Sequence, residues 1–300
     1  MINGIVNVYK EKGFTSFDVV AKMRGIFQQK KIGHTGTLDP EAEGVLPVCL
    51  GRATKVCDLL TDKDKEYEAV LLLGVMTDTQ DLSGEVLEER PVEATEKEVR
   101  DAIVSFIGDY MQIPPMYSAL KVNGQKLCDL ARKGVTVERK ARPVTIHEIE
   151  ILSVELPEVR MRVHCSKGTY IRTLCQDIGE KLGCGGCMKS LLRTRVAAFA
   201  IEDALKLDEL EARFKSGDKS FIHAADSVFL QYEKASVYET ADRLVRNGNR
   251  IPEEFICNMQ EKYKQDCIRL YGWEGTFIGL FSYKEETKDF KPIKLFQTEL

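Results

Sequence analysis

The pattern of apolar and polar positions along the chain changes period several times, as expected for interleaved strands and helices. Residues 4–9 alternate weakly and residues 65–74 form a mostly apolar run, so both predict strands. Residues 159–165 alternate strictly between an apolar face and a basic one, which predicts a half-buried strand. Apolar residues at helical spacing predict a helix over residues 17–29, and a capping box at residues 95–98 predicts the start of another.

The stretch from Gly33 to Gly51 is different, because it holds four glycines and two prolines. This density excludes one long helix or strand across the whole stretch. Its later apolar residues predict that part of it is buried, and a loop anchored in this way can hold a reactive side chain still. Asp39 precedes Pro40, so its backbone should be extended or in a turn. Taken alone, an Asp-Pro pair is most often a plain turn.

Two later parts of the chain also stand apart. Residues 122–144 follow a pair of tandem prolines and are polar, basic and interrupted by glycines, as a nucleic-acid-binding loop or insert would be. From about Tyr232 short β-like runs follow one another, which predicts a small β-rich module. We therefore expect a larger domain over residues 1–231, with a basic segment at about residues 121–143, and a module over residues 232–300.

Composition is typical of a soluble globular protein, with 43% apolar and 30% charged residues in a chain of 300. No apolar run approaches the roughly 20 residues that a membrane helix needs. The N-terminus lacks the basic and apolar regions of a signal peptide. We therefore expect a cytoplasmic protein that does not bind membranes.

The nine cysteines are spread along the chain, mostly in stretches that suit reduced core cysteines. Cys184 and Cys187 form a Cys-x-x-Cys pair, which can be half of a zinc site or a redox pair. Structural zinc usually needs four protein ligands, and no second pair completes the set. The four histidines also lack the spacing of metal ligands. We expect no metal site.

The formal charge of −4 conceals a strong segregation of charge. Seven basic residues against two acidic ones lie between Lys121 and Arg142, and four basic residues with no acidic one lie between Arg160 and Arg172. If these segments share a face, that face can bind a polyanion. If they lie on separate faces, they are ordinary solvated charge.

Several motifs, in a fixed order, resemble one family. They are Lys10 with Gly13-Phe-Thr-Ser16, Gly33-His-Thr-Gly-Thr-Leu-Asp39-Pro with Gly44-Val-Leu-Pro47, Tyr117-Ser-Ala-Leu-Lys121, and Cys165-Ser-Lys-Gly-Thr-Tyr-Ile-Arg172. Over roughly residues 4–200 the chain resembles the bacterial tRNA pseudouridine-55 synthases of the TruB type. The resemblance implies an α+β fold, with a mixed, largely antiparallel sheet, flanking helices and a small C-terminal PUA-like RNA-binding module. One departure is Glu11, where the family usually has proline.

The resemblance also implies roles for individual residues. Asp39 would be the essential catalytic residue, Arg172 would pair with it, and Tyr67 would stack on the target base in the active site. From the residues alone, a tyrosine in a strand is normally a packing residue, and an arginine at a helix start normally forms a surface ion pair. Lys10 would fix the catalytic loop, and His34 would contact RNA or hold the loop. The substrate-binding or RNA-binding residues that we expect are Lys10, His34, Tyr170, Leu191, Arg193, Lys121 and Arg132.

The implied reaction breaks the bond from the ribose to N1 of uracil and rejoins the base through C5. No electrons or groups enter from outside, so we expect no cofactor. Asp39 could attack the ribose carbon, attack the base or remove a ribose proton. The target nucleotide must be flipped out of folded RNA at a cost of a few kcal/mol, and stacking on an aromatic ring can return about 1–3 kcal/mol. We expect the protein to be a monomer that binds the T-stem loop of tRNA, with uridine 55 as its target.

Other functions account for parts of the sequence. A non-catalytic RNA-binding protein or tRNA-folding chaperone on the same scaffold would keep the basic segments but would not need Asp39 or Arg172. A small-molecule hydrolase that uses Asp39 and His34 would leave the basic segments unexplained. The short chain and the lack of lysine-rich tails argue against a guide-RNA-dependent synthase.

Overall fold

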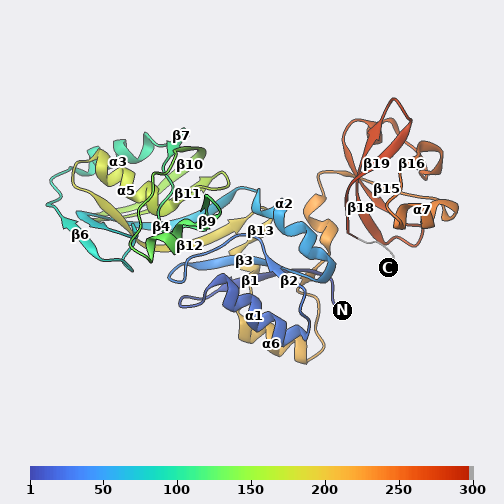
Figure 1. Cartoon of the computed structure of the whole chain (residues 1–300), viewed down its shortest axis with the longest axis horizontal. Coiled ribbons are helices and arrows are strands. Elements are labelled where there is room, and N and C mark those ends of the chain that lie inside the picture. Colours follow the sequence, from blue (N-terminus) through green and yellow to red (C-terminus); the bar gives the residue numbers. More distant parts are fainter. Residues whose placement is uncertain (297–300) are drawn as a thin grey trace.

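The computed structural model describes residues 1–296 and contains one large sheet (Figure 1). The strands of this sheet are β1 (Gly4–Lys10), β2 (Ile32–His34), β3 (Glu43–Leu50), β4 (Lys65–Leu73), β7 (Gly108–Gln112), β10 (Arg142–Glu155), β11 (Glu158–Cys165), β12 (Gly186–Val196), β13 (Phe199–Ala200) and β14 (Ile222–His223). The main path runs β14-β1-β3-β12-β4-β11-β10-β7, while β2 pairs with β3 and β13 with β12. Only β3 and β12 are parallel neighbours in this sheet of the described chain, so it is mixed and largely antiparallel.

Helices cover the two ends of the large sheet separately (Figure 1). At one end α1 (Ser16–Phe27) and α6 (Leu207–Lys215) pack on β1 and β3. At the other end α3 (Glu96–Val104) and α5 (Ile171–Lys181) pack on β4, β10 and β11. Shorter elements complete this part: α2 (Cys57–Thr61), α4 (Leu127–Ala131), the hairpin of β5 (Val75–Thr77) with β6 (Val86–Glu89), and the hairpin of β8 (Lys121–Val122) with β9 (Gln125–Lys126).

Both predicted helix starts are confirmed. Thr15 is the N-cap of α1 and forms a capping box with Asp18, and Thr95 does the same with Glu98 at α3. The first helix ends at Phe27, because Gln28 takes a left-handed backbone conformation.

A second sheet forms the C-terminal part of the chain, drawn in orange and red in Figure 1. It contains β15 (Glu233–Ser236), β16 (Ile251–Pro252), β17 (Cys267–Tyr271), β18 (Phe277–Lys284) and β19 (Asp289–Leu295), in the order β15-β17-β18-β19-β16, with the short helix α7 (Asp242–Arg246) beside it. The expected α+β class with a small C-terminal β-rich part is confirmed. We retain residues 1–231 and 232–300 as the proposed division into domains. Within residues 1–296, no helix is both long enough and apolar enough to span a membrane.

The weak alternation over residues 4–9 has a physical reason, because β1 is buried on both faces. Val6 and Val8 pack against the layer of α1 and α6, whereas Ile5 points to the opposite cluster. The same holds for β3, where Leu46 faces α1 and Cys49 faces the other side. A strand with two buried faces is apolar throughout and loses the period of two.

The glycine-rich stretch from residue 33 to residue 51 contains more regular structure than its composition suggests, because β3 runs straight through Pro47. The carbonyl of Pro47 accepts a hydrogen bond from the Thr35 N–H, so the missing N–H of Pro47 faces the point where β2 ends at His34. The missing N–H thus lies where the neighbouring strand ends and not against β1, a position at which a strand tolerates proline. Gly44 permits the close approach of β12, since a Cβ at this position would lie 2.2 Å from the Arg193 carbonyl oxygen.

One apolar cluster joins the two sheets, and we call it the bridging cluster. It contains Ile5, Val45, Cys49, Ala53, Val56, Leu60, Val196, Phe199 and Phe229 from the first part, and Cys267, Leu280 and Phe296 from the second. The ring of Phe296 lies 5.6 Å from that of Phe229 and 5.2 Å from that of Phe277. The C-terminal sheet is therefore packed against the large sheet by shared core residues.

Candidate active site

The loop between β2 and β3 carries Asp39 and is held by neighbouring residues from several directions. Ser16, at the start of α1, accepts a hydrogen bond from the Leu38 N–H at 2.9 Å. The ammonium of Lys10 donates to the carbonyls of Ala42 at 2.6 Å and Pro40 at 3.2 Å. Both Ser16 and Lys10 are buried, so these bonds are shielded from water and fix the backbone on either side of Asp39.

Arg193 holds the same loop from the opposite side. Its guanidinium is buried and donates to the carbonyl of Val45 at 2.7 Å and to that of Gly36 at 3.4 Å. Lys10 and Arg193 were both expected among the RNA-binding residues. Their side chains are 0% and 1% exposed and are committed to loop carbonyls, so the structure places them as supports of the loop and not at a surface that RNA could reach.

Asp39 and Arg172 meet although they are 133 residues apart in the sequence. Arg172 Nε lies 3.1 Å from Asp39 Oδ2, and Arg172 Nη2 lies 3.4 Å from Asp39 Oδ1. This two-point contact fixes both the position and the rotation of the carboxylate. The Arg172 side chain is only 6% exposed, whereas that of Asp39 is 38% exposed. The carboxylate is therefore held by a buried partner and remains partly accessible to a substrate.

Arg172 is itself held by groups from separate segments. It lies in the first turn of α5, and its guanidinium donates to the carbonyls of Thr79 at 3.0 Å and Tyr117 at 2.8 Å. Asp81 Oδ2 lies 3.7 Å from Arg172 Nη1. The amide of Gln112 bonds both the N–H and the carbonyl of Tyr170, directly before the helix. The arginine is thus oriented before any substrate arrives.

The charges around Asp39 oppose one another. Burial raises the pKa of the Asp39 carboxyl above its usual value, and the Asp81 carboxylate raises it further. Arg172 acts in the other direction and lowers this pKa, with a smaller contribution from Lys10. The ionised form of Asp39 therefore depends on Arg172.

Tyr67 lies in β4 beside the loop, where its side chain is packed in the cluster that contains Leu38 and Ala42. It is 8% exposed. Burial raises the pKa of the Tyr67 phenol, while the neighbouring Arg193 guanidinium opposes that rise. The phenol therefore stays neutral at physiological pH, and the charge of Asp39 makes a further small contribution to raising the Tyr67 pKa.

His34 ends β2 at the entrance to the loop. Its Nδ1 accepts a hydrogen bond from the Gly36 N–H at 3.3 Å, and burial together with the Arg193 charge lowers its pKa. The imidazole is therefore neutral at physiological pH. The ring of Phe17 meets that of His34 edge to face, with ring centroids 5.8 Å apart. Phe17 is 72% exposed, which makes it an unused aromatic surface next to the site.

The remaining expected residues lie around this centre in different ways. Tyr170 is half-buried at the N-cap of α5, two residues before Arg172, and burial raises the pKa of its phenol, with a smaller contribution from the Asp39 charge. Leu191 is half-buried against the cluster of α3 and α5. Lys121 and Arg132 are exposed in the segment that includes α4, where Arg132 pairs with Asp129 at 3.5 Å.

The basic segments differ in how much charge they leave free. On β11, Arg162 is paired with both Glu68 and Glu150, and Lys167 beyond it is paired with Asp62. Among residues 1–296, by contrast, no carboxylate lies within 4.0 Å of any of five basic residues in the other segment: Lys121, Lys126, Lys133, Lys140 and Arg142. Free positive charge therefore concentrates around α4 and the chain that follows it, beside Tyr117 and Arg172.

Three residues near the site were not anticipated individually. Asp81 belongs to a polar loop in which Thr79 and Ser83 donate hydrogen bonds to its carboxylate, and the signal for it was the acidic, glycine-ended run of residues 78–84. Phe17 stands one residue inside a predicted helix, where an aromatic side chain on the polar face was the available signal. Gln112 precedes the tandem prolines and carried no chemical signal of its own.

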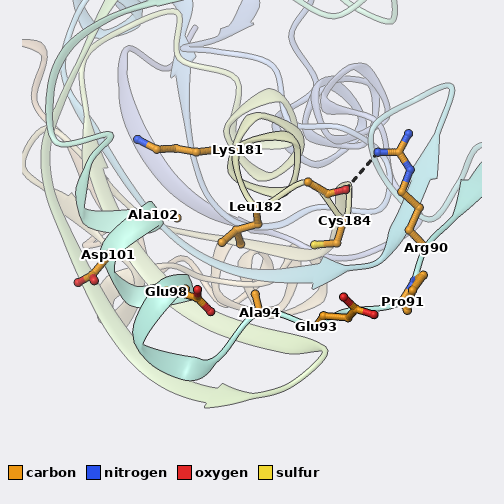
Figure 2. Close-up of a pocket in the computed structure, with 11 residues that line it drawn as sticks. Arg90, Pro91, Glu93, Ala94, Glu98, Asp101, Ala102, Lys181, Leu182 and Cys184 are labelled. Atoms are coloured by element: carbon orange, nitrogen blue, oxygen red, sulfur yellow. Dashed lines mark hydrogen bonds between the residues drawn. The ribbon is translucent and has the colours of Figure 1, made fainter.

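A separate hollow lies at the C-terminal end of α5, away from these residues (Figure 2). Its volume is about 770 Å³, and Arg90, Glu98, Lys181 and Cys184 are among the residues that line it. Arg90 spans its rim and donates a hydrogen bond to the Gly183 carbonyl. Cys184 is a free thiol that contacts backbone carbonyls, and Cys187 is also free, so the Cys-x-x-Cys pair is not a disulfide here.

Comparison with known proteins gives consistent results. Residues 24–171 match the model of the N-terminal domain of TruB family pseudouridylate synthases, and residues 172–235 match that of a tRNA pseudouridylate synthase B C-terminal domain. A protein of Lachnoclostridium phytofermentans named tRNA pseudouridine synthase B is 56% identical over 98% of this chain and 100% of its own length. Its namesake from Alkaliphilus oremlandii is 46% identical over 98% of this chain and 97% of its own. Among solved structures, a chain of a Cbf5-Nop10-Gar1 complex is 26% identical, with a TM-score of 0.72 over 98% of this chain and 85% of that chain.

Proposed function

Because the chain belongs to the TruB family of pseudouridylate synthases, and is thus an isomerase that converts uridine to pseudouridine in tRNA, we propose that its target is uridine 55 of the T loop and that Asp39 carries the chemistry. The observation that carries this assignment is the contact between a half-exposed carboxylate and a buried guanidinium. It provides an ionised, oriented carboxylate that is partly accessible to a substrate.

In the proposed reaction Asp39 acts as the ionised group that starts cleavage of the glycosidic bond. Arg172 keeps the Asp39 carboxylate ionised and oriented, and the hydrogen bonds of Arg172 to the carbonyls of Thr79 and Tyr117 fix the position of its guanidinium. Pre-formed orientation of this kind lowers the barrier, because the reacting group does not have to be ordered in the transition state. The isomerisation exchanges one bond for another within the substrate, so the proposal requires no cofactor.

The target base must leave the RNA stack to reach Asp39. Tyr67 supports a stacking role, since its ring forms part of the wall beside the loop and its phenol stays neutral. His34 and Phe17 stand at the entrance, where a neutral imidazole and an exposed ring can occupy the space that the flipped base leaves. These roles account for aromatic groups both inside the site and at its mouth.

The RNA backbone would follow the free positive charge of residues 121–142, which lies next to the site through Tyr117. Lys121 and Arg132 are the residues of the original expectation that fit this contact. We further propose that the C-terminal sheet contacts the same tRNA, and that the protein acts as a cytoplasmic monomer.

The test is release of tritium from C5 of uracil in an unmodified tRNA transcript, with wild type, Asp39→Asn and Glu41→Gln compared. Glu41 is the matched control, because it lies in the same loop but is exposed and paired only with Lys12. We expect release by wild type and Glu41→Gln at a single uridine, and none by Asp39→Asn.

RNA binding by each variant is measured in parallel by filter retention. Equal release by Asp39→Asn and wild type would refute the role of Asp39. Binding of tRNA without release by any of the three would instead support the non-catalytic RNA-binding protein, which the family membership and the retained Asp39–Arg172 pair do not favour.

A further inference from the structure

Three side chains that bind metals in other proteins meet on the outer face of the large sheet, although nothing in their sequence spacing suggests it. They are Asp64, His147 and His164. Asp64 lies in the turn between α2 and β4, His147 in β10 and His164 in β11. Their ligand atoms all lie within 4.8 Å of one another, and His147 Nε2 is 3.3 Å from Asp64 Oδ2.

An irregularity in β10 brings Glu148 to the same face as the two histidines. Ile146 pairs with Cys165 and Glu148 pairs with His164, so His147 is an extra residue without a partner on β11. Ile146 and Ile149 are both buried, which leaves His147 and Glu148 pointing outward in succession. A regular strand would have placed His147 and Glu148 on opposite faces, with His147 outward and opposite His164. The β-bulge therefore keeps His147 beside His164, with ring centroids 4.8 Å apart, and adds Glu148 next to them.

The donor set selects a class of metal. Two imidazoles and one carboxylate are ligands of Zn²⁺ and its neighbours Co²⁺ and Ni²⁺, and are poorly matched to Mg²⁺, which prefers oxygen alone. In a tetrahedral zinc site with bonds of about 2.0–2.1 Å, ligand atoms lie about 3.3 Å apart. Asp64 and His147 already have this separation, and His164 is half-exposed with its ring next to that of His147. Glu148, the register partner of His164, adds negative charge on the same face.

We infer that Asp64, His147 and His164 form a binding site for a zinc-class divalent metal, with water completing the coordination. This site is separate from the proposed chemistry. Its place in the fold gives it a structural role, because it would tie together the start of β4, which carries Tyr67, and the end of β11, which leads through residues 166–170 to Arg172. The metal would thus clamp the two strand ends nearest to the active site.

The test is titration of the full-length, chelator-treated protein with Zn²⁺ by calorimetry and with Co²⁺ by absorption spectroscopy. We expect one ion per chain for wild type. Loss of an outer hydrogen-bond partner alone weakens metal binding by about 10–100-fold, so His147→Gln, His164→Gln and Asp64→Asn should each weaken it at least as much. All three side chains are at least partly exposed, so the variants should fold, which circular dichroism will verify.

His223→Gln is the matched control, since His223 is also exposed and its ring contacts only Phe199 within the described chain. It should bind like wild type, and Zn²⁺ should raise the unfolding temperature of both equally. The inference is overturned if wild type and His147→Gln bind Zn²⁺ with the same affinity. It is also overturned if bound Co²⁺ shows thiolate charge-transfer absorption, which would place the metal on cysteines.

Discussion

Replacement of Arg172 by lysine tests the central contact of the site while keeping the positive charge. The guanidinium makes two contacts with Asp39, at 3.1 and 3.4 Å, and donates to two carbonyls. An ammonium has three donors but no planar fork, so it cannot reproduce the two-point contact and both carbonyl bonds together. The variant should therefore keep the positive charge next to Asp39 but no longer fix the orientation of its carboxylate.

The size of the effect follows from the geometry. A misplacement of about 1 Å in a reacting group can cost about 100-fold in rate, which corresponds to about 2.7 kcal/mol of activation free energy. Breaking a buried ion pair destabilises a protein by about 3–5 kcal/mol, and because Asp39 is 38% exposed and can be rehydrated, we expect a loss at or below the lower end. Arg172→Lys should thus be folded, with a rate reduced about 100-fold.

The pH profile gives an independent measurement. Asp39 has to be ionised, and its folded pKa is raised, so activity is present above that pKa and is lost as the pH falls through it. Arg172 lowers this pKa, so weakening the contact should move the acidic limb of the single-turnover rate to higher pH. Arg162→Lys is the control, because Arg162 also contacts two carboxylates, both at 2.7 Å, but lies on the outer face. A wild-type rate and acidic limb in Arg172→Lys would refute the reasoning.

Three further predictions concern the surroundings of Asp39. Ser16→Ala removes the acceptor of the buried Leu38 N–H, so it should lower the free energy of unfolding by about 1–3 kcal/mol and also reduce the rate. The control Thr95→Ala removes a helix cap elsewhere, so in urea unfolding it should cost about 1 kcal/mol without changing the rate. Phe17→Ala should leave stability unchanged but raise KM for tRNA about tenfold, because one exposed stacking surface is lost; an unchanged KM would remove Phe17 from the RNA contact. Burial lowers the pKa of Lys10 to about 8, so between about pH 8 and 10.5 the unfolded chain binds more protons than the folded one. As the pH rises through this range, the free energy of unfolding of wild type should therefore increase relative to that of Lys10→Met. A difference between the two that stays constant with pH would contradict this.

The motifs around Asp39, together with those that end at Arg172, were enough to predict the family and the fold class, and both predictions are confirmed. Local signals also predicted elements well where one physical rule dominates, as at the capping box of residues 95–98, which starts α3. The roles of the individual site residues stay predictions. The resemblance implied that Arg172 pairs with Asp39, and the structure has the two in contact, which no local pattern encodes over 133 residues.

Other features depend on tertiary context that a linear pattern does not contain. Composition excluded one strand across the whole of residues 33–51, as found, but it gave no sign that β3 would run through Pro47, whose ring nitrogen lies on the side where the shorter strand β2 ends. Arg193 looked like an RNA-binding cation, yet it is buried because loop carbonyls replace water around it. Lys10 was expected both to fix the loop and to bind substrate or RNA, and its buried ammonium makes the loop contacts. The outward position of Glu148 beside His147 did leave a trace, since Ile146 and Ile149 are spaced by three in a strand and so break the period of two.

The bridging cluster has a consequence for how this molecule can measure its substrate. Because Phe296 and Leu280 share a core with Phe229 and Phe199, the C-terminal sheet is not free to move independently of the large sheet. The span from that sheet to Asp39 is therefore set by the fold. If both contact tRNA as we propose, the two contacts would lie a fixed distance apart on the folded RNA. We would then expect an RNA whose arms were lengthened by a few base pairs to present its uridine away from Asp39, however well its loop sequence matched.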